Sequence, residues 1–527
     1  MRISFLIIFC AFAGTLYAQP AITSFSPTFG STGTQVTVNG AGFDLTPTQN
    51  IVYFGHAWAI PTASSGTTLT VTVPANASSV NPIRVTNLTS GLSVDSWTAA
   101  VPRFHVTFSG GAIASTSFTA SNINLATIAT EAIAVGDFDL DGDLDIAVGL
   151  NAGGSGVGNL QIYFNNGSGS FTLSSQNGNL NISDMLALDL EGDGDLDLIL
   201  KGDNYLVKIN DGSGNFSDGA AIAAANGTRG FNLADINEDG NWDVVMGASN
   251  ADAQWGAGNG AGNFTFNQIS AATGVGIAVG SAVGDLNKDG HTDIVIPNYN
   301  ESILVYASND GSGSFSKSNT AATFQPGSVD VGDFNNDNNL DVAIAPLASG
   351  TNIRRFLGNG NGTFQAGQNL TASGDPRSIV TGDYNGDGND DLMVVDYSAT
   401  GNPRFFLGAG NNTFSTVQIN GGTGAGAFTK PIVADFNGDS KPDMVMTERN
   451  GQNIRLYIRN SETPTTQATN ISFANIGTAQ MDLSWSNGNG SKRIVVVKEG
   501  SVVNSSPVNS STYTSNTNFG SGDQLGT

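Results

Sequence analysis

A nine-residue acidic segment that recurs seven times is the feature that most constrains the fold. The first copy reads DFDLDGDLD at residues 137–145, and successive copies start 46 to 52 residues apart. Each copy, numbered here as loop one to loop seven, has acids or amides at positions 1, 3, 5 and 9, a turn residue at position 6 and an apolar run after position 9. Such a period predicts an array of similar units. The leading aspartates are Asp137, Asp189, Asp235, Asp285, Asp333, Asp383 and Asp435.

A glycine-rich signature ending in phenylalanine lies between consecutive acidic segments. It reads NNGSGSF at 165–171 and NDGSGNF at 210–216, and it recurs after each segment up to the sixth. Small turn residues followed by an aromatic residue predict a tight hairpin whose ring is buried at the start of the next strand. Together with the apolar runs, the hairpins predict about four strands in each unit, which is the size of a propeller blade.

The two halves of the repeat predict that the array closes into a ring. The seventh acidic segment is followed by NIRLYIRN, without the glycine hairpin and its phenylalanine. The missing strand is expected before the first segment, where Phe118 precedes Asp137 by 19 residues, within the 18 to 21 that separate the other phenylalanines from their next segment. We therefore predict an all-β chain with a seven-bladed β-propeller over residues 104–460, closed by its N-terminal strand.

The acidic segments have the donor chemistry of a calcium site. Oxygen donors at positions 1, 3, 5 and 9, with a bend at position 6 and a main-chain carbonyl near position 7, suit a hard cation with many oxygen ligands. Without a cation the carboxylates repel one another. Zinc is disfavoured because His56, His105 and His291 do not cluster in the sequence. An EF-hand is excluded because the twelfth position of the first copy is Val148.

The loop pattern DxDxDGxxD, with AVGDFDLDGDLDIAV around the first copy and GNGNGTF between copies, resembles the FG-GAP/VCBS repeat family. That family includes the seven-bladed propeller of integrin α-chains. The resemblance implies one Ca²⁺ per blade, up to seven, held between the first two strands of the blade, with ligands bound at the opposite face. Asn338 and Ser440 replace the bending glycine, and Ser440 is followed by Lys441, so loop seven is expected to bind calcium most weakly or to stay empty.

The side-chain ligands that the resemblance implies occupy positions 1, 3, 5 and 9 of each loop. They are Asp137, Asp139, Asp141, Asp145, Asp189, Glu191, Asp193, Asp197, Asp235, Asn237, Asp239, Asp243, Asp285, Asn287, Asp289, Asp293, Asp333, Asn335, Asp337, Asp341, Asp383, Asn385, Asp387, Asp391, Asp435, Asn437, Asp439 and Asp443.

The chain termini predict further segments. Arg2, the apolar run ISFLIIFCAFAG and Ala18 predict a signal peptide over residues 1–18, cleaved after Ala18, because the run is shorter than the roughly 20 residues of a membrane span. Residues 20–97 are similar to an IPT/TIG immunoglobulin-like sandwich. Residues 461–470 form a polar linker, and 471–527 resemble part of a fibronectin type III-like domain, a truncated β-sandwich fragment typical of Bacteroidetes-type surface proteins.

Charge and composition limit the function. A net charge of −25 disfavours nucleic acid and anionic lipid as partners, and the mature chain has no predicted integral membrane segment. We expect a secreted or cell-surface protein, a calcium-stiffened adhesion or ligand-binding module for glycan or protein, with Tyr205, Tyr299 and Tyr397 in the loops opposite the calcium. A purely architectural segment of a larger adhesin remains an alternative. An accessory part of a polysaccharide-degrading enzyme is a weaker one, and we expect no enzyme, because nearly all clustered carboxylates are committed to metal.

Overall fold

The computed structural model describes most of the chain between residues 19 and 486. The described residues are 19–55, 57–74, 77, 83–90, 92–96, 104–108, 111–124, 129–151, 159–178, 180–202, 205–222, 228–248, 253–269, 280–347, 350, 352–372, 374–396, 402–420, 431–448, 453–460, 469–475 and 482–486. The predicted signal peptide and linker residues 461–468 therefore lie outside the described part. The chain divides into two compact units, Met1–Asn460 and Ser461–Thr527.

The first unit begins with a sandwich of two four-stranded sheets. One sheet has the order β1 (Ala21–Ser26), β3 (Gln35–Ala41), β7 (Thr68–Thr72), β6 (Ala63–Ser64). The other has the order β5 (Ala57–Ala59), β4 (Asn50–Phe54), β8 (Ile83–Asn87), β9 (Leu92–Asp95). A short 3₁₀ helix, η1 (Pro47–Gln49), precedes β4. Alternating apolar residues of β3 and β7, such as Val36 and Leu69, fill the space between the sheets.

The boundary between this sandwich and the next domain differs from the prediction. Strand β10 (His105–Val106) pairs in parallel with β2 (Phe29–Gly30). Phe104 and Val106 are buried in the sandwich core, with Phe104 edge-on to Phe54. Residues 104–106 thus belong to the sandwich and not to the propeller, because the parallel pairing carries their side chains into its core.

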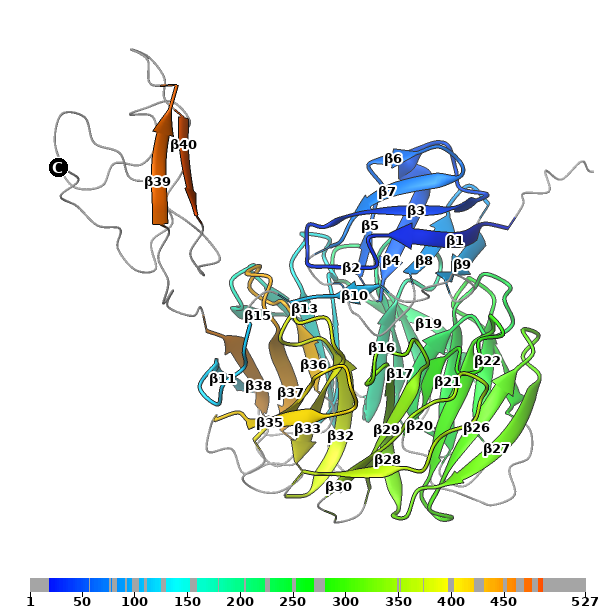
Figure 1. Ribbon diagram of the computed structural model, residues 1–527. Coiled ribbons are helices and arrows are strands. Elements are labelled where there is room, and N and C mark those ends of the chain that lie inside the picture. Colours follow the sequence, from blue (N-terminus) through cyan, green and yellow to red (C-terminus); the bar gives the residue numbers. More distant parts are fainter. Residues whose placement is uncertain are drawn as a thin grey trace, which may run out of the picture. The chain divides into compact units, whose positions relative to one another are not determined.

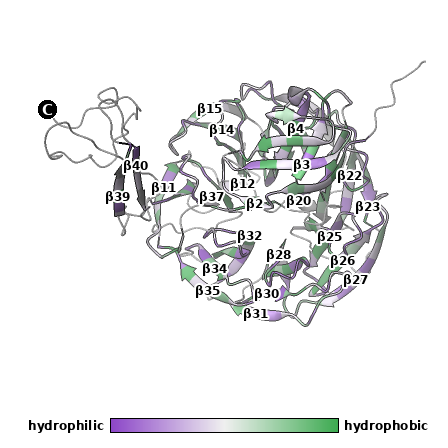
Figure 2. Cartoon of the chain, turned by 45° about the horizontal axis from the view of Figure 1, so that its top comes forward, coloured by the Kyte–Doolittle hydropathy of each residue, from purple (hydrophilic) through white to green (hydrophobic). Residues whose placement is uncertain are grey.

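Within the described residues, seven further four-stranded antiparallel sheets follow, which we call blades one to seven (Figures 1 and 2). Blade one consists of β12 (Ala129–Gly136), β13 (Asp145–Asn151), β14 (Asn159–Asn165) and β15 (Phe171–Gly178), and blade two of β16 (Asp184–Leu188), β17 (Asp197–Lys201), β18 (Tyr205–Ile209) and β19 (Ser217–Ile222). Blade three consists of β20 (Thr228–Ala234), β21 (Asp243–Ala248), β22 (Gln254–Gly258) and β23 (Phe264–Gln268), and blade four of β24 (Ala282–Gly284), β25 (Asp293–Asn298), β26 (Ile303–Asn309) and β27 (Phe315–Ala321). Blade five consists of β28 (Pro326–Gly332), β29 (Asp341–Pro346), β30 (Asn352–Phe356) and β31 (Gln368–Thr371), and blade six of β32 (Pro376–Gly382), β33 (Asp391–Asp396), β34 (Arg404–Gly408) and β35 (Phe414–Gln418).

Blade seven takes its fourth strand from the N-terminal side of blade one. Its order is β11 (Phe118–Asn124), β38 (Asn453–Arg459), β37 (Asp443–Glu448), β36 (Ile432–Ala434). The pairing of β11 with β38 is antiparallel and unbroken, from Phe118 opposite Arg459 to Asn124 opposite Asn453. The strand that precedes loop one therefore covers the edge of the last sheet, which would otherwise expose unpaired backbone groups.

Side chains between neighbouring blades form the cores of the propeller. Second strands are buried on both faces, as in the DIVIPN segment of β25, because each blade is covered by two others. Figure 2 shows first strands such as β12 and β28 toward the middle of the ring and fourth strands such as β27 and β31 on its outside. The all-β fold class is confirmed.

The glycine hairpins fit against the preceding blade. A Cβ on Gly313 would lie 2.2 Å from the Trp255 ring of blade three, so only glycine permits this approach. In blade six, Asn412 stands at the equivalent position, and Arg355 of blade five donates a hydrogen bond of 2.6 Å to its carbonyl. At the interface between blades five and six, an asparagine–arginine pair therefore takes the place of a glycine packed on an aromatic ring.

The second unit contains one described hairpin, β39 (Thr469–Ala474) paired antiparallel with β40 (Asp482–Ser486). The rest of the predicted fibronectin type III-like fragment lies outside the described residues. In the part of the chain that the structure describes, no helix has both the length and the apolar character that crossing a membrane requires.

Candidate metal centre

All seven acidic loops lie at the same end of their blades, between the first and second strands. Loop one joins β12 to β13, and the glycine hairpin of the same blade joins β14 to β15 beside it. We call this end of the propeller the acidic end. Each loop starts with the residue that follows the first strand and finishes with the first residue of the second strand, as in Asp137 and Asp145. The predicted placement of the loops within each blade is therefore what the structure shows.

Main-chain amides fold each loop around its first aspartate. In loop one, the Asp137 Oδ1 and Oδ2 atoms accept hydrogen bonds from the amides of Asp141 at 3.1 Å and Gly142 at 3.0 Å. The amide of position 6 donates to the carboxylate of position 1 in all seven loops. Position 5 accepts from the amide of position 7 in the same way, as Asp141 does from Asp143. These bonds fix the carboxylates of positions 1 and 5 within the loop.

Two positions of each loop have the left-handed backbone conformation. Position 6 has it in every loop, with φ between 85° and 96° at five glycines and 64° at both Asn338 and Ser440. Position 4 has it too, although it is a leucine in loop one, where Leu140 has φ 60°. The bend at position 6 agrees with the prediction from the sequence, whereas the bend at position 4 was not predicted. The glycines at position 4 of loops two, six and seven, such as Gly192, were the available signal.

The aspartate at position 9 has a second role that the spacing did not reveal. Asp145 is fully buried, and its Oδ2 accepts from the Phe138 amide at 3.0 Å while its Oδ1 accepts from the Asn165 amide at 2.9 Å. The same two bonds, to position 2 of the loop and to the end of the third strand, recur in all seven blades. Position 9 therefore ties the acidic loop to the third strand in addition to facing the other carboxylates.

Loop one has the geometry of a cation site. Oxygens of Asp137, Asp139 and Asp145 lie within 4.8 Å of one another. The pKa of Asp137 is raised to about 6 and that of Asp145 to about 7, mainly by burial and in smaller part by the neighbouring carboxylates. A divalent cation would offset this crowding of negative charge, and an all-oxygen donor set with no sulfur or nitrogen fits calcium. When bound, the ion would supply the positive charge that offsets the carboxylates of loop one and would hold their oxygens as its ligands.

Loops two to six keep this pattern with altered donors. In loops three to six, asparagine replaces aspartate at position 3, and its Nδ2 donates to the Oδ2 of position 5, as Asn237 does to Asp239 at 3.0 Å. In loop two, burial and a hydrogen bond with Glu191 raise the pKa of Asp197, so the longer Glu191 side chain still reaches position 9. Each of these loops retains oxygen atoms at all four ligand positions.

Loop seven contains a positive side chain of its own. The Lys441 side chain is only 6% exposed, and its Nζ lies 3.5 Å from Asp439 Oδ2, the same position 5 oxygen that asparagine engages elsewhere. The amide of Ser440 still donates to Asp435, at 2.6 Å, so the backbone of the loop is unchanged. The structure therefore gives a specific basis for the expectation that loop seven binds calcium poorly.

The three tyrosines predicted for the opposite end have different surroundings. The prediction for Tyr205 is wrong: the residue is 5% exposed and its ring packs edge-on against Phe231 of blade three, because β18 turns this side chain into the interface between blades. Tyr299 is partly exposed in the turn between β25 and β26, at the end opposite loop four. Tyr397 lies outside the described residues, so its prediction is untested.

A buried carboxylate that the sequence analysis did not single out lies at that opposite end of blade six. Asp396, the last residue of β33, is 4% exposed, and its Oδ1 has no hydrogen-bond partner within the described structure. Its pKa is raised to about 6, mainly by burial; the charge of Arg404 opposes this shift and that of Asp375 adds to it. Arg377 forms a two-bond ion pair with Asp375 at 2.9 and 3.0 Å. Four charged residues thus meet where β32 and β34 begin and β33 ends.

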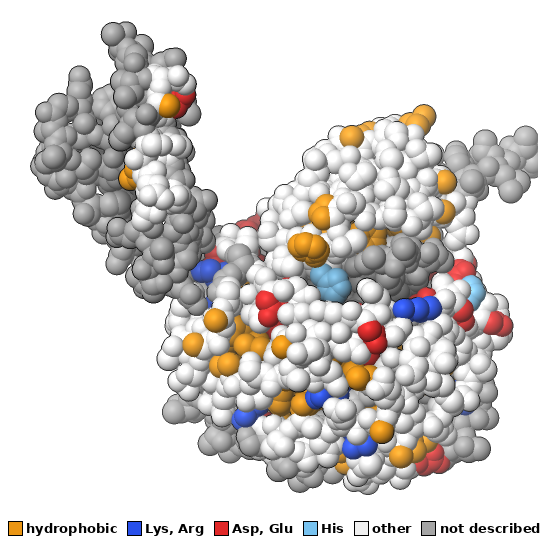
Figure 3. Space-filling model, viewed as in Figure 1, with side chains coloured by type: hydrophobic (Ala, Val, Ile, Leu, Met, Phe, Trp, Pro, Cys, Tyr) orange, Lys and Arg blue, Asp and Glu red, His pale blue; other side chains and the backbone are white. Residues whose placement is uncertain are grey.

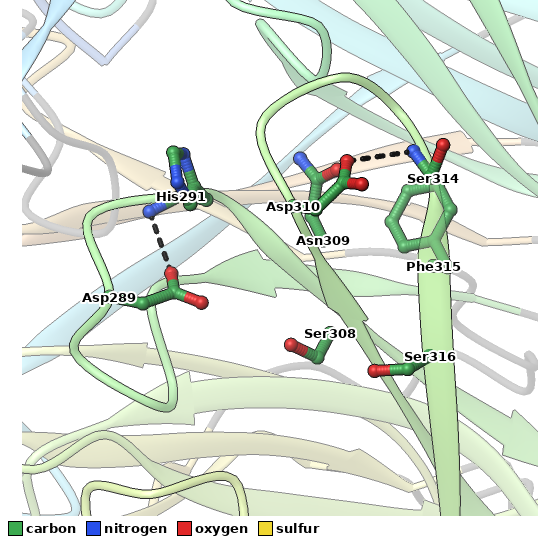
Figure 4. A pocket seen from close by; sticks show the side chains of 8 residues that line it. All are labelled: Asp289, His291, Ser308, Asn309, Asp310, Ser314, Phe315 and Ser316. Carbon is green, nitrogen blue, oxygen red and sulfur yellow. Dashed lines mark hydrogen bonds between the residues drawn. The ribbon is translucent and has the colours of Figure 1, made fainter.

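An open groove of about 550 Å³ lies at the acidic end of blade four (Figure 4). Asp289 and His291 of loop four line one side, and Asp310 and Phe315 of the glycine hairpin line the other. Because Asp289 is at position 5, this groove opens beside the predicted metal loop, and the hairpin adds one carboxylate, that of Asp310, to its surroundings. On the face shown in Figure 3, lysine and arginine side chains lie singly among uncharged atoms.

The comparisons with protein families agree with this architecture. The model of the FG-GAP-like repeat matches residues 137–200, 235–296, 285–344, 333–394 and 383–446, which together make up more than half of the chain. The IPT/TIG domain model matches residues 20–106, which includes β10. No curated protein matches the chain.

Solved structures with similar folds have low sequence identity. An auxiliary nutrient binding protein from Bacteroides ovatus is 12% identical over 84% of this chain and 98% of its own, with a TM-score of 0.37. An Agrocybe aegerita protein described by its specific recognition of non-reducing terminal N-acetylglucosamine is 17% identical over 72% and 91%, with a TM-score of 0.41. Sqt1 from Saccharomyces cerevisiae is 10% identical over 66% and 100%, with a TM-score of 0.44. Similarity at this level says nothing about what the chain binds.

Proposed function

The chain belongs to the FG-GAP-like repeat family, and on this premise we propose that it is an exported calcium-binding β-propeller that binds an extracellular glycan or protein. In this proposal the calcium ions have a structural role, and the ligand is held at the end of the propeller opposite the acidic loops. The chain itself has no catalytic centre in this proposal.

The observation that carries the calcium proposal is the convergence of carboxylate oxygens in loop one, within 4.8 Å of one another. The hydrogen bonds that shape loop one recur in the other loops, which supports one site per blade in loops one to six. Extracellular modules bind calcium weakly, so each ion adds little alone. At a calcium concentration about ten times the dissociation constant, each site would contribute roughly 1.4 kcal/mol, and several sites together would rival the stability of a domain.

Metal analysis and thermal unfolding test the calcium proposal. After dialysis against calcium, the purified protein should retain several ions per chain, and addition of EGTA should lower the melting temperature by about 10 °C or more. Restoring calcium should reverse the loss, whereas magnesium should restore less because it prefers small octahedral sites. A protein that holds no calcium, or melts at the same temperature with EGTA, contradicts the proposal.

Asp396 supports placing the ligand at the opposite end. Its buried Oδ1 accepts no hydrogen bond from the residues that the structure describes, and hydroxyl groups of a sugar or an amide group of a peptide can donate to such an acceptor. The partly exposed ring of Tyr299 adds an aromatic surface at the same end of blade four, where a sugar face can stack.

A glycan array and a panel of extracellular matrix proteins would identify the ligand. Asp396→Asn, which replaces the carboxylate acceptor by a neutral amide oxygen, and Tyr299→Ala, which removes the ring, should each weaken binding by about tenfold. The matched control is Asp211→Asn, an exposed aspartate in a hairpin of the acidic end, which should bind as the unmodified chain does. Binding that is unchanged by both substitutions at the opposite end contradicts this placement.

Two alternatives make different predictions in the same experiments. A purely architectural segment of a larger adhesin would retain no glycan or protein above background, although it would still bind calcium. An accessory part of a polysaccharide-degrading enzyme would retain a polysaccharide, and release of reducing ends by the chain alone would contradict the non-catalytic proposal.

A further inference from the structure

The N-terminal sandwich lies over one end of the propeller, and two of its strands are buried on both faces (Figure 1). Every residue of β4 and of β8 is buried. One face of the two strands is buried because it packs in the core of the sandwich, where Val52 and Val85 lie. The other face of these strands has Tyr53 directly opposite Arg84 in the pairing register, and both are covered, at 3% and 1% exposure. An outer sheet face of an isolated sandwich would be exposed, so the covering comes from elsewhere.

Loops two and three cover that face. The Tyr53 hydroxyl donates a hydrogen bond of 2.7 Å to Asp189 Oδ2, which is position 1 of loop two. An Arg84 guanidinium nitrogen donates one of 2.7 Å to the carbonyl of Gly240, which is position 6 of loop three. The guanidinium also lies 3.9 Å from the centre of the Trp242 ring, and Tyr53 meets the same ring edge-on. The sandwich therefore contacts two loops that the calcium proposal assigns to metal.

The contact is close enough to depend on the shape of the loops. A Cβ on Gly240 would lie 2.8 Å from the Ser93 amide nitrogen of the sandwich, so this loop meets the sandwich backbone directly. Arg84 is paired with Asp95 at 3.3 Å, so the docked face adds no net charge to the loops.

We infer that the sandwich docks on loops two and three through Tyr53 and Arg84, and that calcium in these loops and docking of the sandwich stabilise each other. The inference rests on the proposed calcium function. An ion would fix the position 1 carboxylate, which Tyr53 uses in loop two, and would hold the backbone of the loop, whose position 6 carbonyl Arg84 uses in loop three. Conversely, the Tyr53 hydroxyl donates to Asp189 Oδ2, the oxygen that also accepts from the Gly194 amide, and so would hold that carboxylate in place for the ion. By linkage, each event raises the affinity of the other by the same factor.

Hydroxyl-radical footprinting of the full chain measures docking directly, because it reports the exposure of individual side chains. Free calcium is set with EGTA buffers, at a temperature below the onset of unfolding. Removal of calcium should raise the labelling rates of Tyr53 and Trp242 by about fivefold or more, the effect of a modest coupling between sites. Tyr457, which is fully buried in blade seven away from the sandwich, should stay protected and so exclude general unfolding.

Tyr53→Phe removes one hydroxyl and tests the coupling from the side of the sandwich. The calcium concentration that half-protects Trp242 should rise by about fivefold in this variant. The matched control is Tyr306→Phe, which removes another tyrosine hydroxyl bonded to a loop carboxylate, Asp293 at 2.8 Å, but within blade four. The control should leave the protection of Trp242 at its original calcium concentration.

The outcomes separate this inference from the calcium proposal. Calcium that is bound in equilibrium dialysis, with labelling of Tyr53 and Trp242 independent of it, overturns the coupling and leaves the calcium proposal in place. An equal shift in Tyr53→Phe and Tyr306→Phe also overturns it, because the effect then does not pass through the sandwich. A chain that binds no calcium overturns both proposals.

Discussion

Loops one and seven have nearly the same backbone and opposite charge arrangements. Both fold around the first aspartate with the same amide bonds, and both bury the aspartate at position 9. In loop one, the Asp139 and Asp141 carboxylates are adjacent, and Asp141 helps to raise the pKa of Asp139, after burial. In loop seven, Lys441 brings an ammonium group to the position 5 carboxylate.

The difference indicates that backbone hydrogen bonds set the shape of the loop and that a positive charge offsets the negative charge of its carboxylates. The charge is supplied from outside in loop one, under our proposal, and by a side chain in loop seven. The same backbone thus tolerates either source. The following predictions test how far this comparison holds, in order of decreasing effect.

The pH dependence of the calcium-free protein should show the largest effect. Burial raises the pKa of Asp145 from its ordinary value of 3.8 to about 7 and that of Asp443 to about 8. Between the ordinary pKa of 3.8 and these raised values, the folded protein binds more protons than the unfolded one. Its stability therefore falls as the pH rises through this range, up to about 7 to 8. In EGTA, the melting temperature should fall by several degrees or more from pH 5 to pH 8.

Calcium should reverse this dependence, because protons compete with the ion for the same carboxylates. The calcium-loaded protein should therefore be destabilised on acidification, as measured by scanning calorimetry at matched ionic strength. Parallel pH profiles with and without calcium would show that the loops do not exchange protons for ions.

In the calcium-free protein, loss of the position 9 carboxylate should cost the same in both loops. Asp145→Asn and Asp443→Asn each replace an acceptor of two backbone amides by a group with one acceptor oxygen, which leaves one buried amide unpaired. In EGTA, each should reduce the free energy of unfolding by about 1–3 kcal/mol in urea titrations. With calcium, Asp145→Asn should cost more than Asp443→Asn, because it also removes a proposed ligand from loop one.

Asp139→Ala is the contrasting change in loop one, since Asp139 is only partly buried and its carboxylate does not tie two strands together. It should lower the stability of the calcium-loaded protein and leave that of the EGTA-treated protein within about 0.5 kcal/mol. A cost for Asp145→Asn that appears only with calcium would mean that position 9 acts as a metal ligand alone.

Removal of the internal cation should convert loop seven into a calcium site. Lys441→Asn frees the Asp439 carboxylate, and the number of calcium ions bound per chain in equilibrium dialysis should rise by about one. Lys288→Asn, which removes an exposed lysine at position 4 of loop four, is the matched control and should leave the number unchanged. The same stoichiometry in both variants would show that Lys441 does not compete with calcium.

Relief of backbone strain at position 4 should have the smallest effect. Leu140 has the left-handed conformation that glycine has at the equivalent Gly438 of loop seven. Leu140→Gly should therefore raise the free energy of unfolding by about 0.5–1 kcal/mol, while Gly438→Ala should lower it by a similar amount. Denaturant titrations in EGTA measure both, and a loss of stability in Leu140→Gly would contradict this reading of the loop.

The periodic features of the fold were predictable because each depends on residues close in sequence. The hairpin glycines, the apolar strands after Asp145 and its counterparts, and the strand at Phe118 follow from local spacing and turn chemistry. The error at Tyr205 has a physical cause, since an aromatic residue in a polar stretch reads as exposed until the neighbouring blade is in place. Spacing likewise placed Phe104 in the propeller, although its side chain packs in the sandwich.

By itself, the sequence determined the repeat, the all-β class and the donor atoms of the acidic loops, because these depend on the order of residues within about ten positions. Only the tertiary structure decided that Asp145 also binds the amide at the end of the third strand, that Lys441 turns inward to Asp439, and that Tyr53 and Arg84 cover loops two and three. These contacts join residues from separate strands or domains. Their geometry is set by how whole sheets pack, which no local pattern encodes.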